Sequence, residues 1–333
     1  MHSAQRTAQR SSAAYGDSVG TKDFYGEDPD GYVVCFGGRP AVDWARAGCA
    51  ARAFLQLDCE RNPMRWNAIR EVIGGMNLFA VRLALRDRDL ARWYVSRCLQ
   101  MYDEAAGRGL QPRDPVGYIV DSGWADLSAC GHVQLPVRPG GEGGSTRLDE
   151  WFHLASVTRA LQPRRVFEIG TFTGYTTVAF ILNSAKDAEI ISLDLPPNAS
   201  VPASQKANYI DTDVDFIQNR KLGSYVRDLG LESRYQQLHC DSMEFDPRPY
   251  LASVELAFID GAHSLAYVRN DTEKVAQMMA ARGLVFWHDY GGKGRFGPLT
   301  DYLESLSQSI ALYRVPGTTL AWTSAAELSQ LGR

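Results

Sequence analysis

The chain of 333 residues lacks any hydrophobic run that approaches the roughly 18 residues needed for a membrane-spanning helix. Its first residues, 1–14, are mostly polar and lack the apolar core of a secretory signal. It also lacks an excess of positive charge, since it has 35 Lys and Arg but 39 Asp and Glu, and its pI is about 5.9. A dedicated nucleic-acid-binding domain is usually basic. We therefore expect a cytoplasmic protein that acts on neither nucleic acid nor membrane.

Closely spaced cysteines are missing as well. The six cysteines are scattered and no two have the C-x-x-C spacing of zinc or redox motifs. Reduced thiols of a cytoplasmic enzyme account for them most simply. The 45% hydrophobic content is enough for a large core, and the length favours more than one domain.

A dinucleotide fingerprint is absent from the most informative stretch, residues 164–175, which reads R-R-V-F-E-I-G-T-F-T-G-Y. An apolar strand leads here into a glycine turn and then into a predicted helix, the arrangement by which an open α/β sheet holds a nucleotide-like ligand. Phe172 stands where G-x-G-x-x-G has its second glycine. A ligand with ribose and adenine but no pyrophosphate fits this turn better.

Two further predicted strands end in acidic residues. The segment 188–195 ends at Asp194, 24 positions after Gly170, near the spacing at which an acidic side chain binds a ribose diol. The segment 236–241 ends at Asp241, with Ser242 following. Three such features at the ends of successive strands are harder to explain as solvated loops than any one alone.

In these motifs the chain resembles the class I S-adenosylmethionine-dependent methyltransferases over roughly residues 140–325, and most closely their metal-dependent O-methyltransferase branch. The resemblance implies a Rossmann-like α/β fold with a seven-stranded, mostly parallel sheet that ends in a C-terminal antiparallel hairpin, here 310–316 with 318–323. It implies S-adenosyl-L-methionine as cofactor, bound by residues of the glycine turn and of three later strand ends: Glu168, Gly170, Thr171, Gly174, Tyr175, Asp194, Asp241, Ser242 and Asp260.

Two later buried strands, 254–263 and 283–290, present the candidate catalytic residues. The first ends with Asp260 and His263, and the second with His288 and Asp289. Sites of open α/β sheets lie beyond the carboxyl ends of the strands, so these side chains should converge. An imidazole is suited to take a hydroxyl proton, and His263 is the predicted general base, with Asp260 and His288 as further catalytic candidates.

The resemblance also implies a divalent cation, Mg²⁺ or another, at Asp260, His288 and Asp289. His288 departs from the acidic or amide residue of the family, which leaves the metal in question because Mg²⁺ prefers oxygen ligands. Each of these residues has a structural alternative: His263 could brace its turn, His288 could line the pocket, and the two aspartates could fix loops.

The expected organisation is a flexible tail at 1–20, a mainly helical region at 21–135 for a cap or homo-oligomer contact, and the methyltransferase domain at 140–326. Proline and glycine at 136–144 mark the boundary, and Thr146 with Asp149 predicts the start of a helix that ends before Pro163. A helix is also expected at 265–281, with Gly283 just beyond its end.

The sequence thus predicts an S-adenosylmethionine-dependent methyltransferase acting on an oxygen of a small natural product or sugar. An N-methyltransferase without metal, a non-catalytic cofactor-binding protein and a nicotinamide-dependent oxidoreductase are the alternatives. The acidic run at 211–215 suggests a calcium loop, but Phe216 and Leu222 occupy the positions that need Gly and Glu, so we reject that interpretation.

Overall fold

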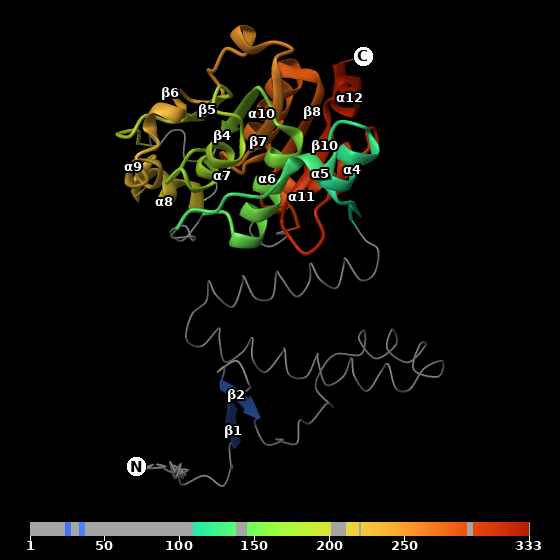
Figure 1. Cartoon of the computed structure of the whole chain (residues 1–333). Coiled ribbons are helices and arrows are strands. Elements are labelled where there is room, and N and C mark those ends of the chain that lie inside the picture. Colours follow the sequence, from blue (N-terminus) through green and yellow to red (C-terminus); the bar gives the residue numbers. More distant parts are fainter. Residues whose placement is uncertain are drawn as a thin grey trace, which may run out of the picture. The chain divides into compact units, whose positions relative to one another are not determined.

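The computed structural model describes residues 24–27, 33–36, 109–137, 145–200, 211–219, 221–291 and 296–332 (Figure 1). Contacts divide the chain into two units, Met1–Met76 and Asn77–Arg333. In the first unit, β1 (Phe24–Glu27) and β2 (Val33–Phe36) form an antiparallel pair. The flexible tail predicted at 1–20 and most of the helical region predicted at 21–135 lie outside the described residues.

The second unit contains one sheet of eight strands in the order β3-β9-β10-β8-β7-β4-β5-β6. Its strands are β3 (Gln111–Pro112), β4 (Arg165–Ile169), β5 (Glu189–Asp194), β6 (Gln236–His239), β7 (Val254–Ile259), β8 (Met279–Trp287), β9 (Tyr313–Arg314) and β10 (Ala321–Ser324). Its helices are α4 (Pro115–Asp121), α5 (Leu127–Cys130), α6 (Leu148–Leu161), α7 (Tyr175–Asn183), α8 (Asp211–Asn219), α9 (Ser224–Asp228), α10 (Leu265–Met278), α11 (Gly297–Leu306) and α12 (Ala325–Leu328). Single 3₁₀ turns are η3 (Glu232–Arg234), η4 (Arg248–Tyr250) and η5 (Ser329–Gly332).

The sheet is mostly parallel, as predicted. Strands β4 to β8 pair in parallel, and β10 runs antiparallel between β8 and β9. The predicted C-terminal hairpin is therefore confirmed. The two-residue strand β3 pairs with β9 and makes the sheet eight-stranded instead of seven-stranded. A strand of this length has no sequence periodicity by which to predict it.

Both faces of the sheet are buried, because alternate residues of its central strands enter two separate cores. In β7, Leu256 and Phe258 pack with α6 and α7, whereas Ala257 and Ile259 pack with α10. Helices cover both faces, as Figure 1 shows. This is why the strands read as continuous hydrophobic runs instead of alternating ones. The arrangement leaves the strand ends as the place where polar side chains gather.

The predicted boundary at 136–144 lies mostly outside the described residues and stays a prediction. Residues 109–137, which we assigned to the helical N-terminal region, supply β3, α4 and α5 to the unit that contains the sheet. Strand β3 pairs with β9, and α4 and α5 both contact α6.

Two helix ends differ from their predictions. The cap of α6 is Arg147, whose backbone N–H donates to Glu150 at 3.2 Å, whereas Thr146 bonds the Thr176 hydroxyl at 2.5 Å. Helix α10 ends at Met278, and β8 begins at once with Met279. Gly283 lies inside that strand, where a Cβ atom would lie 2.9 Å from the carbonyl oxygen of Glu255. Gly283 therefore allows β8 to lie close to β7 and does not end helix α10.

The two glycines of the turn after β4 are required by close contacts. Gly170 has a φ of +100°, and a Cβ atom there would lie 1.9 Å from the carbonyl oxygen of Asp260. Gly174 has a φ of +83°, and its Cβ atom would lie 2.5 Å from Val226. The two glycines therefore admit the end of β7 and helix α9.

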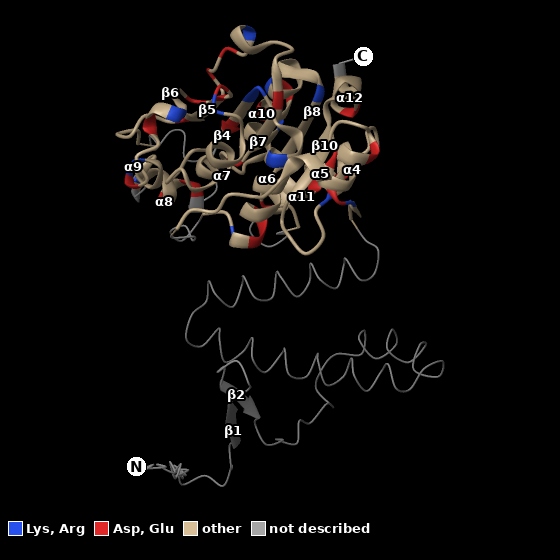
Figure 2. Cartoon of the chain, viewed as in Figure 1, with Lys and Arg blue, Asp and Glu red and all other residues tan. Residues whose placement is uncertain are grey.

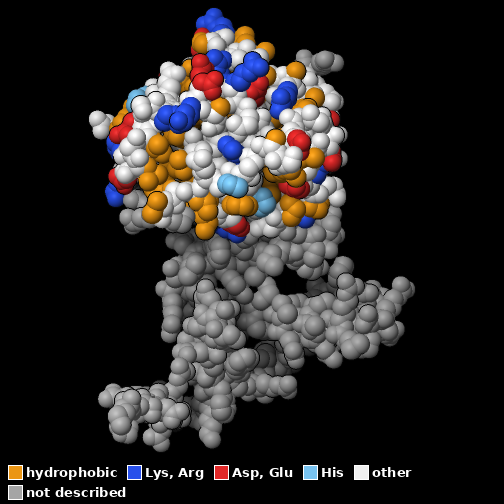
Figure 3. Space-filling model, viewed as in Figure 1, with side chains coloured by type: hydrophobic (Ala, Val, Ile, Leu, Met, Phe, Trp, Pro, Cys, Tyr) orange, Lys and Arg blue, Asp and Glu red, His pale blue; other side chains and the backbone are white. Residues whose placement is uncertain are grey.

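Basic and acidic residues are mixed in the views of Figures 2 and 3. Figure 2 shows Lys and Arg interspersed with Asp and Glu along the described elements. On the face drawn in Figure 3, hydrophobic side chains lie between charged ones of both signs. Within the described part of the chain, no helix combines the length and the apolar character needed to cross a membrane.

The contact at Gly170 predicts a large loss of stability in Gly170→Ala. Its Cβ atom has no space and its φ lies in the left-handed region, so we expect the free energy of unfolding to fall by about 3 kcal/mol or more. Gly317→Ala is the matched control, because Gly317 has a φ of +73° but nothing within 4 Å of its Cβ position. Only the backbone cost of about 1–2 kcal/mol should appear there. Urea unfolding measures both, and equal losses would contradict the close contact.

Candidate functional site

A cavity of about 140 Å³ lies at the carboxyl ends of the central parallel strands. Its wall includes residues of the turn after β4, the ends of β5 to β8 and one face of α8. Of the predicted site residues, the structure places seven on its lining: Gly170, Asp194, Asp241, Ser242, Asp260, His263 and Asp289. Residues from five strand ends that are far apart in sequence thus meet at one place, as the topology requires.

Glu168 does not line this cavity. Its side chain is fully buried, and Oε2 accepts hydrogen bonds from the hydroxyls of Thr177 and Ser192 at 2.6 and 2.5 Å. Oε1 has no hydrogen-bond partner among the described residues. Burial raises the pKa of Glu168 to about 8, although the two hydroxyls oppose the shift. The side chain therefore braces β4 against β5 and α7 from inside.

Thr171 and Tyr175 are also absent from the lining, as is Gly174. The hydroxyl of Thr171 lies 2.6 Å from Ser192 Oγ and accepts a hydrogen bond from Gln237 Nε2 at 2.9 Å. The carbonyl of Tyr175 accepts the indole N–H of Trp151 at 2.9 Å. These residues hold the turn in place, and their predicted contact with a cofactor stays a prediction.

Asp194 has a local role beside its predicted one. Its Oδ2 accepts the backbone N–H groups of Thr171 and Phe172 at 3.1 and 2.9 Å, which fixes the glycine turn on the end of β5. Asp241 is held similarly, since Tyr267 donates its hydroxyl to Oδ2 and the Met243 N–H bonds Oδ1, both at 2.9 Å. Both aspartates remain on the cavity wall in fixed orientations.

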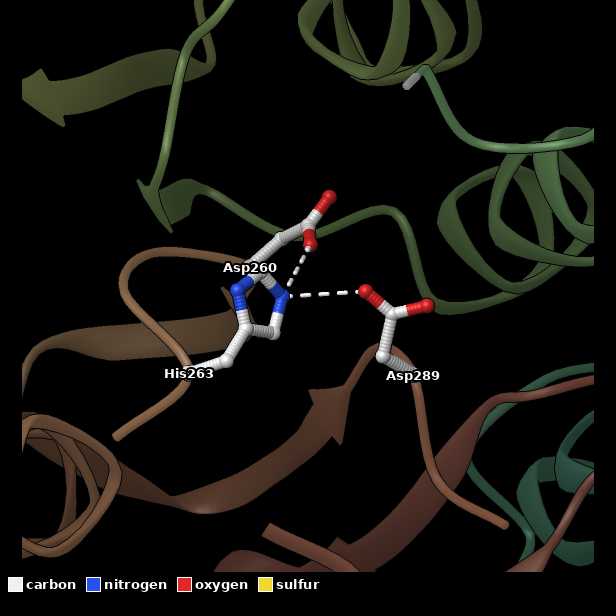
Figure 4. Close-up of side chains that lie close together, drawn as sticks. All are labelled: Asp260, His263 and Asp289. Atoms are coloured by element: carbon white, nitrogen blue, oxygen red, sulfur yellow. Dashed lines mark ion pairs between the residues drawn. The ribbon is translucent and has the colours of Figure 1, made fainter. Parts of the chain in front are cut away.

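The end of β7 and the end of β8 bring three candidate ligands together (Figure 4). One ligand atom from each of Asp260, His263 and Asp289 lies within 4.8 Å of the other two. The imidazole Nε2 of His263 forms ion pairs with Asp289 Oδ2 at 2.9 Å and Asp260 Oδ1 at 3.9 Å. Asp289 has a φ of +62°, a strained conformation that turns its carboxylate toward the imidazole.

The other ring nitrogen of His263 is held by Asp213, which our sequence analysis missed. Asp213 lies on α8 and is 5% exposed. Its Oδ1 lies 2.7 Å from His263 Nδ1, and its Oδ2 accepts the His263 backbone N–H at 2.9 Å. Asp213 belongs to the acidic run that we tested only as a calcium loop. Its distance of 50 residues from His263 explains why no local pattern connects the two.

The carboxylates determine the charge of His263. Burial alone would lower its pKa, but contacts with Asp213 and Asp289 outweigh burial and raise the pKa to about 10. Burial also opposes ionisation of Asp289, yet His288 and His263 hold its pKa well below the usual range. His263 is therefore an imidazolium near neutral pH in this arrangement. It can act as the predicted base only after it releases its proton.

His288 contacts both carboxylates of the predicted metal site, since its Nδ1 lies 3.4 Å from Asp289 Oδ2. Its Nδ1 lies 3.1 Å from Asp260 Oδ1, and its Nε2 lies 3.1 Å from Oε2 of the fully buried Glu150. With both nitrogens directed at carboxylates, the ring supports Asp260 from behind. The group of possible ligands contains His263 beside Asp260 and Asp289, and the role of His288 as a metal ligand stays a prediction.

Comparison with known proteins supports a methyltransferase. The model of a family described as a methyltransferase domain matches residues 167–290, from β4 to just beyond β8. No curated protein matches the chain. Residues 167–290 therefore resemble a methyltransferase domain, which agrees with the predicted enzyme class.

Several solved structures are similar in part. The S-adenosylhomocysteine-bound methyltransferase PaMTH1 of Podospora anserina is 17% identical over 54% of this chain and 77% of its own, with a TM-score of 0.39. TomG of Streptomyces achromogenes, an O-methyltransferase of tomaymycin synthesis, is 14% identical over 54% and 80%, with a TM-score of 0.38. A Geobacter sulfurreducens methyltransferase is 14% identical over 64% and 97%, also at 0.38. These likenesses are too low to carry a conclusion about activity.

The contact between Asp213 and His263 predicts a pH dependence of stability. Because the folded pKa of about 10 exceeds the ordinary value of 6.5, the contribution of His263 is complete below pH 6.5 and disappears as the pH rises to 10. Asp213→Asn should lower this pKa, flatten the decline and cost about 1–3 kcal/mol at pH 6. Urea unfolding across this range measures the effect.

Asp215→Asn is the control, because Asp215 is exposed on the same helix. It should leave the pH profile as in the wild type. A profile of Asp213→Asn that runs parallel to the wild-type profile would show that Asp213 does not raise the pKa of His263.

Proposed function

We propose that this methyltransferase transfers the methyl group of S-adenosylmethionine to a hydroxyl oxygen of a small molecule, such as a natural product or a sugar. The observation that carries the proposal is the position of His263. Its Nδ1 is held by Asp213 and its Nε2 faces Asp260 and Asp289 on the wall of the cavity. A nucleophile or base held in place by a carboxylate on its far side is the usual arrangement for proton transfer.

The charge of the cavity supports a cationic methyl donor. Carboxylates of Asp194, Asp213, Asp241, Asp260 and Asp289 line the wall. S-adenosylmethionine carries a sulfonium, so carboxylates near it favour binding. Asp194 and Asp241 lie at the ends of β5 and β6, where ribose and adenine are expected in an open α/β sheet. The donor would then present its methyl group toward the ends of β7 and β8.

The donor set fits a divalent cation. Asp260 and Asp289 offer carboxylate oxygens, and His263 Nε2 lies beside them within the same 4.8 Å group. The two carboxylates would hold the cation, which when bound would lower the pKa of a hydroxyl on the acceptor. Carboxylate oxygens suit both Mg²⁺ and Mn²⁺. The chain's own part is to orient the acceptor and, once His263 has released its own proton, to take the hydroxyl proton at His263 Nε2.

Methylation of an amine is the second candidate. The same acidic wall would attract a protonated amine, and an amine needs no cation to activate it. Methylation of a hydroxyl is favoured because Asp213 and Asp289 hold the His263 imidazole on the wall of the cavity, where it can take the hydroxyl proton. We keep a small-molecule acceptor, a cytoplasmic location and a homo-oligomer formed through the N-terminal region as parts of the proposal.

The position of Asp194 predicts its effect on donor binding. Asp194→Ala should weaken binding of S-adenosylhomocysteine by about 1–3 kcal/mol, because a buried ribose diol would lose a charged acceptor. Calorimetry measures the affinity, and urea unfolding accounts for the lost contacts to the turn. Asp187→Ala is the control, since Asp187 is exposed just before the opposite end of β5. If the two variants bind alike, Asp194 does not contact the donor.

The proposed chemistry predicts which acceptors react. Labelled methyl groups should pass from the donor to hydroxyl acceptors of a small-molecule panel, and a chelator should suppress the transfer. His263→Ala should lower turnover by roughly 10²–10⁴-fold, the usual contribution of a positioned base, with donor binding nearly intact.

The panel also separates the alternatives. Transfer to amines alone, undiminished by chelator, would replace the proposal with N-methylation. Turnover in His263→Ala at the wild-type rate would remove His263 from proton transfer.

A further inference from the structure

Glu150 is a fully buried carboxylate that the proposed reaction has not used. It lies in the first turn of α6 and is 0% exposed. Oε1 accepts the backbone N–H and the hydroxyl of Thr319 at 2.7 and 2.8 Å. Oε2 accepts the Arg147 N–H at 3.2 Å and lies 3.1 Å from His288 Nε2. Contacts with a helix start, a turn before β10 and the end of β8 fix this side chain on several sides.

The contact with His288 leads directly into the site. The opposite nitrogen of the same ring, Nδ1, lies 3.1 Å from Asp260 Oδ1 and 3.4 Å from Asp289 Oδ2. Glu150, His288 and Asp260 therefore form a continuous chain of polar contacts from α6 to the end of β7. A ring held at one nitrogen has little freedom at the other. The rotation of His288, and with it the N–H donor available to the Asp260 carboxylate, depends on Glu150.

We propose that Glu150 is a positioning residue of the site, which acts through His288 to hold the Asp260 carboxylate in the orientation that faces His263 and Asp289. The inference rests on the proposed function, in which Asp260 holds a cation beside His263. Outer partners of this kind fix the direction of a metal-binding or reacting group, and their loss typically weakens metal binding by 10–100-fold.

A role in packing alone does not explain the choice of glutamate. A buried carboxylate is costly, and apolar side chains of similar volume stabilise a core as well or better. Burial raises the pKa of Glu150, but its contacts with His288 and Thr319 outweigh that effect and lower the pKa to about 2. The charge is therefore retained, and its nearer charged partner is the ring that contacts Asp260, at 3.1 Å against 3.9 Å for the Arg147 guanidinium.

E150Q tests the proposal because the amide keeps the size of the side chain. An amide has one oxygen, so either Thr319 or His288 loses its acceptor. E327Q is the matched control, because Glu327 also accepts a backbone N–H, from Ala311 at 3.0 Å. Glu327 lies on α12, beyond the end of β10 and at the opposite end of the strands from the site. Urea unfolding first establishes that both variants are folded.

Two measurements at one pH then test the chain of contacts from Glu150 through His288 to Asp260. Nitrogen-15 spectra of labelled histidines, of which the chain has six, report the His288 ring once its signals are assigned by their loss in H288Q. Calorimetry with Mn²⁺ reports the site around Asp260. We expect E150Q to change the His288 signals and to weaken Mn²⁺ binding by roughly 10–100-fold, and E327Q to change neither.

A folded E150Q with unchanged His288 signals would overturn the proposal. So would changed signals with unchanged Mn²⁺ affinity, because the effect would then stop at His288. If the wild-type protein binds no Mn²⁺, the cation of the proposed function is wrong. Crystal structures of the wild type and E150Q then test the role of Glu150. The same orientation of Asp260 in both would contradict that role.

Discussion

The backbone of Gly170 lies directly against the carbonyl of Asp260, and the arrangement of the site depends on this contact. The Asp260 N–H donates to the carbonyl of Ile169 at 2.8 Å, and the Gly170 N–H donates to that of Leu193 at the same distance. The ends of β4, β5 and β7 are thereby joined, with no space for a side chain at Gly170. The turn expected to hold the methyl donor and the acid expected to meet the acceptor are fixed to each other through the backbone.

Charge balance explains the rest of the site. Four carboxyl groups, of Glu150, Asp213, Asp260 and Asp289, contact only two imidazoles, of His263 and His288. Each imidazole lies between carboxylates, so each is stabilised in its charged form. The two rings serve different ends: His263 faces the cavity, and His288 supports Asp260 from behind. A cationic donor or a divalent cation in the cavity would compete with His263 for Asp260 and Asp289.

The sequence predicted the features that have a local pattern. Buried parallel strands read as hydrophobic runs, and their ends are marked by Gly170, Asp194, Asp241, Asp260 and Asp289, all of which line the cavity. Features that depend on tertiary contacts could not be predicted from the sequence. Asp213 meets His263 only because α8 folds over the cavity, and Glu150 meets His288 across 138 residues. Glu168 ends buried behind the turn, since one residue in a strand decides which face a side chain occupies.

The most direct test of this account is a crystal structure of the protein with S-adenosylhomocysteine and Mn²⁺. The account predicts the ribose beside Asp194, the sulfur atom turned toward the ends of β7 and β8, and anomalous scattering from a cation in contact with Asp260 and Asp289. A cofactor bound with its sulfur atom directed away from His263, or a cation held elsewhere in the chain, would contradict it.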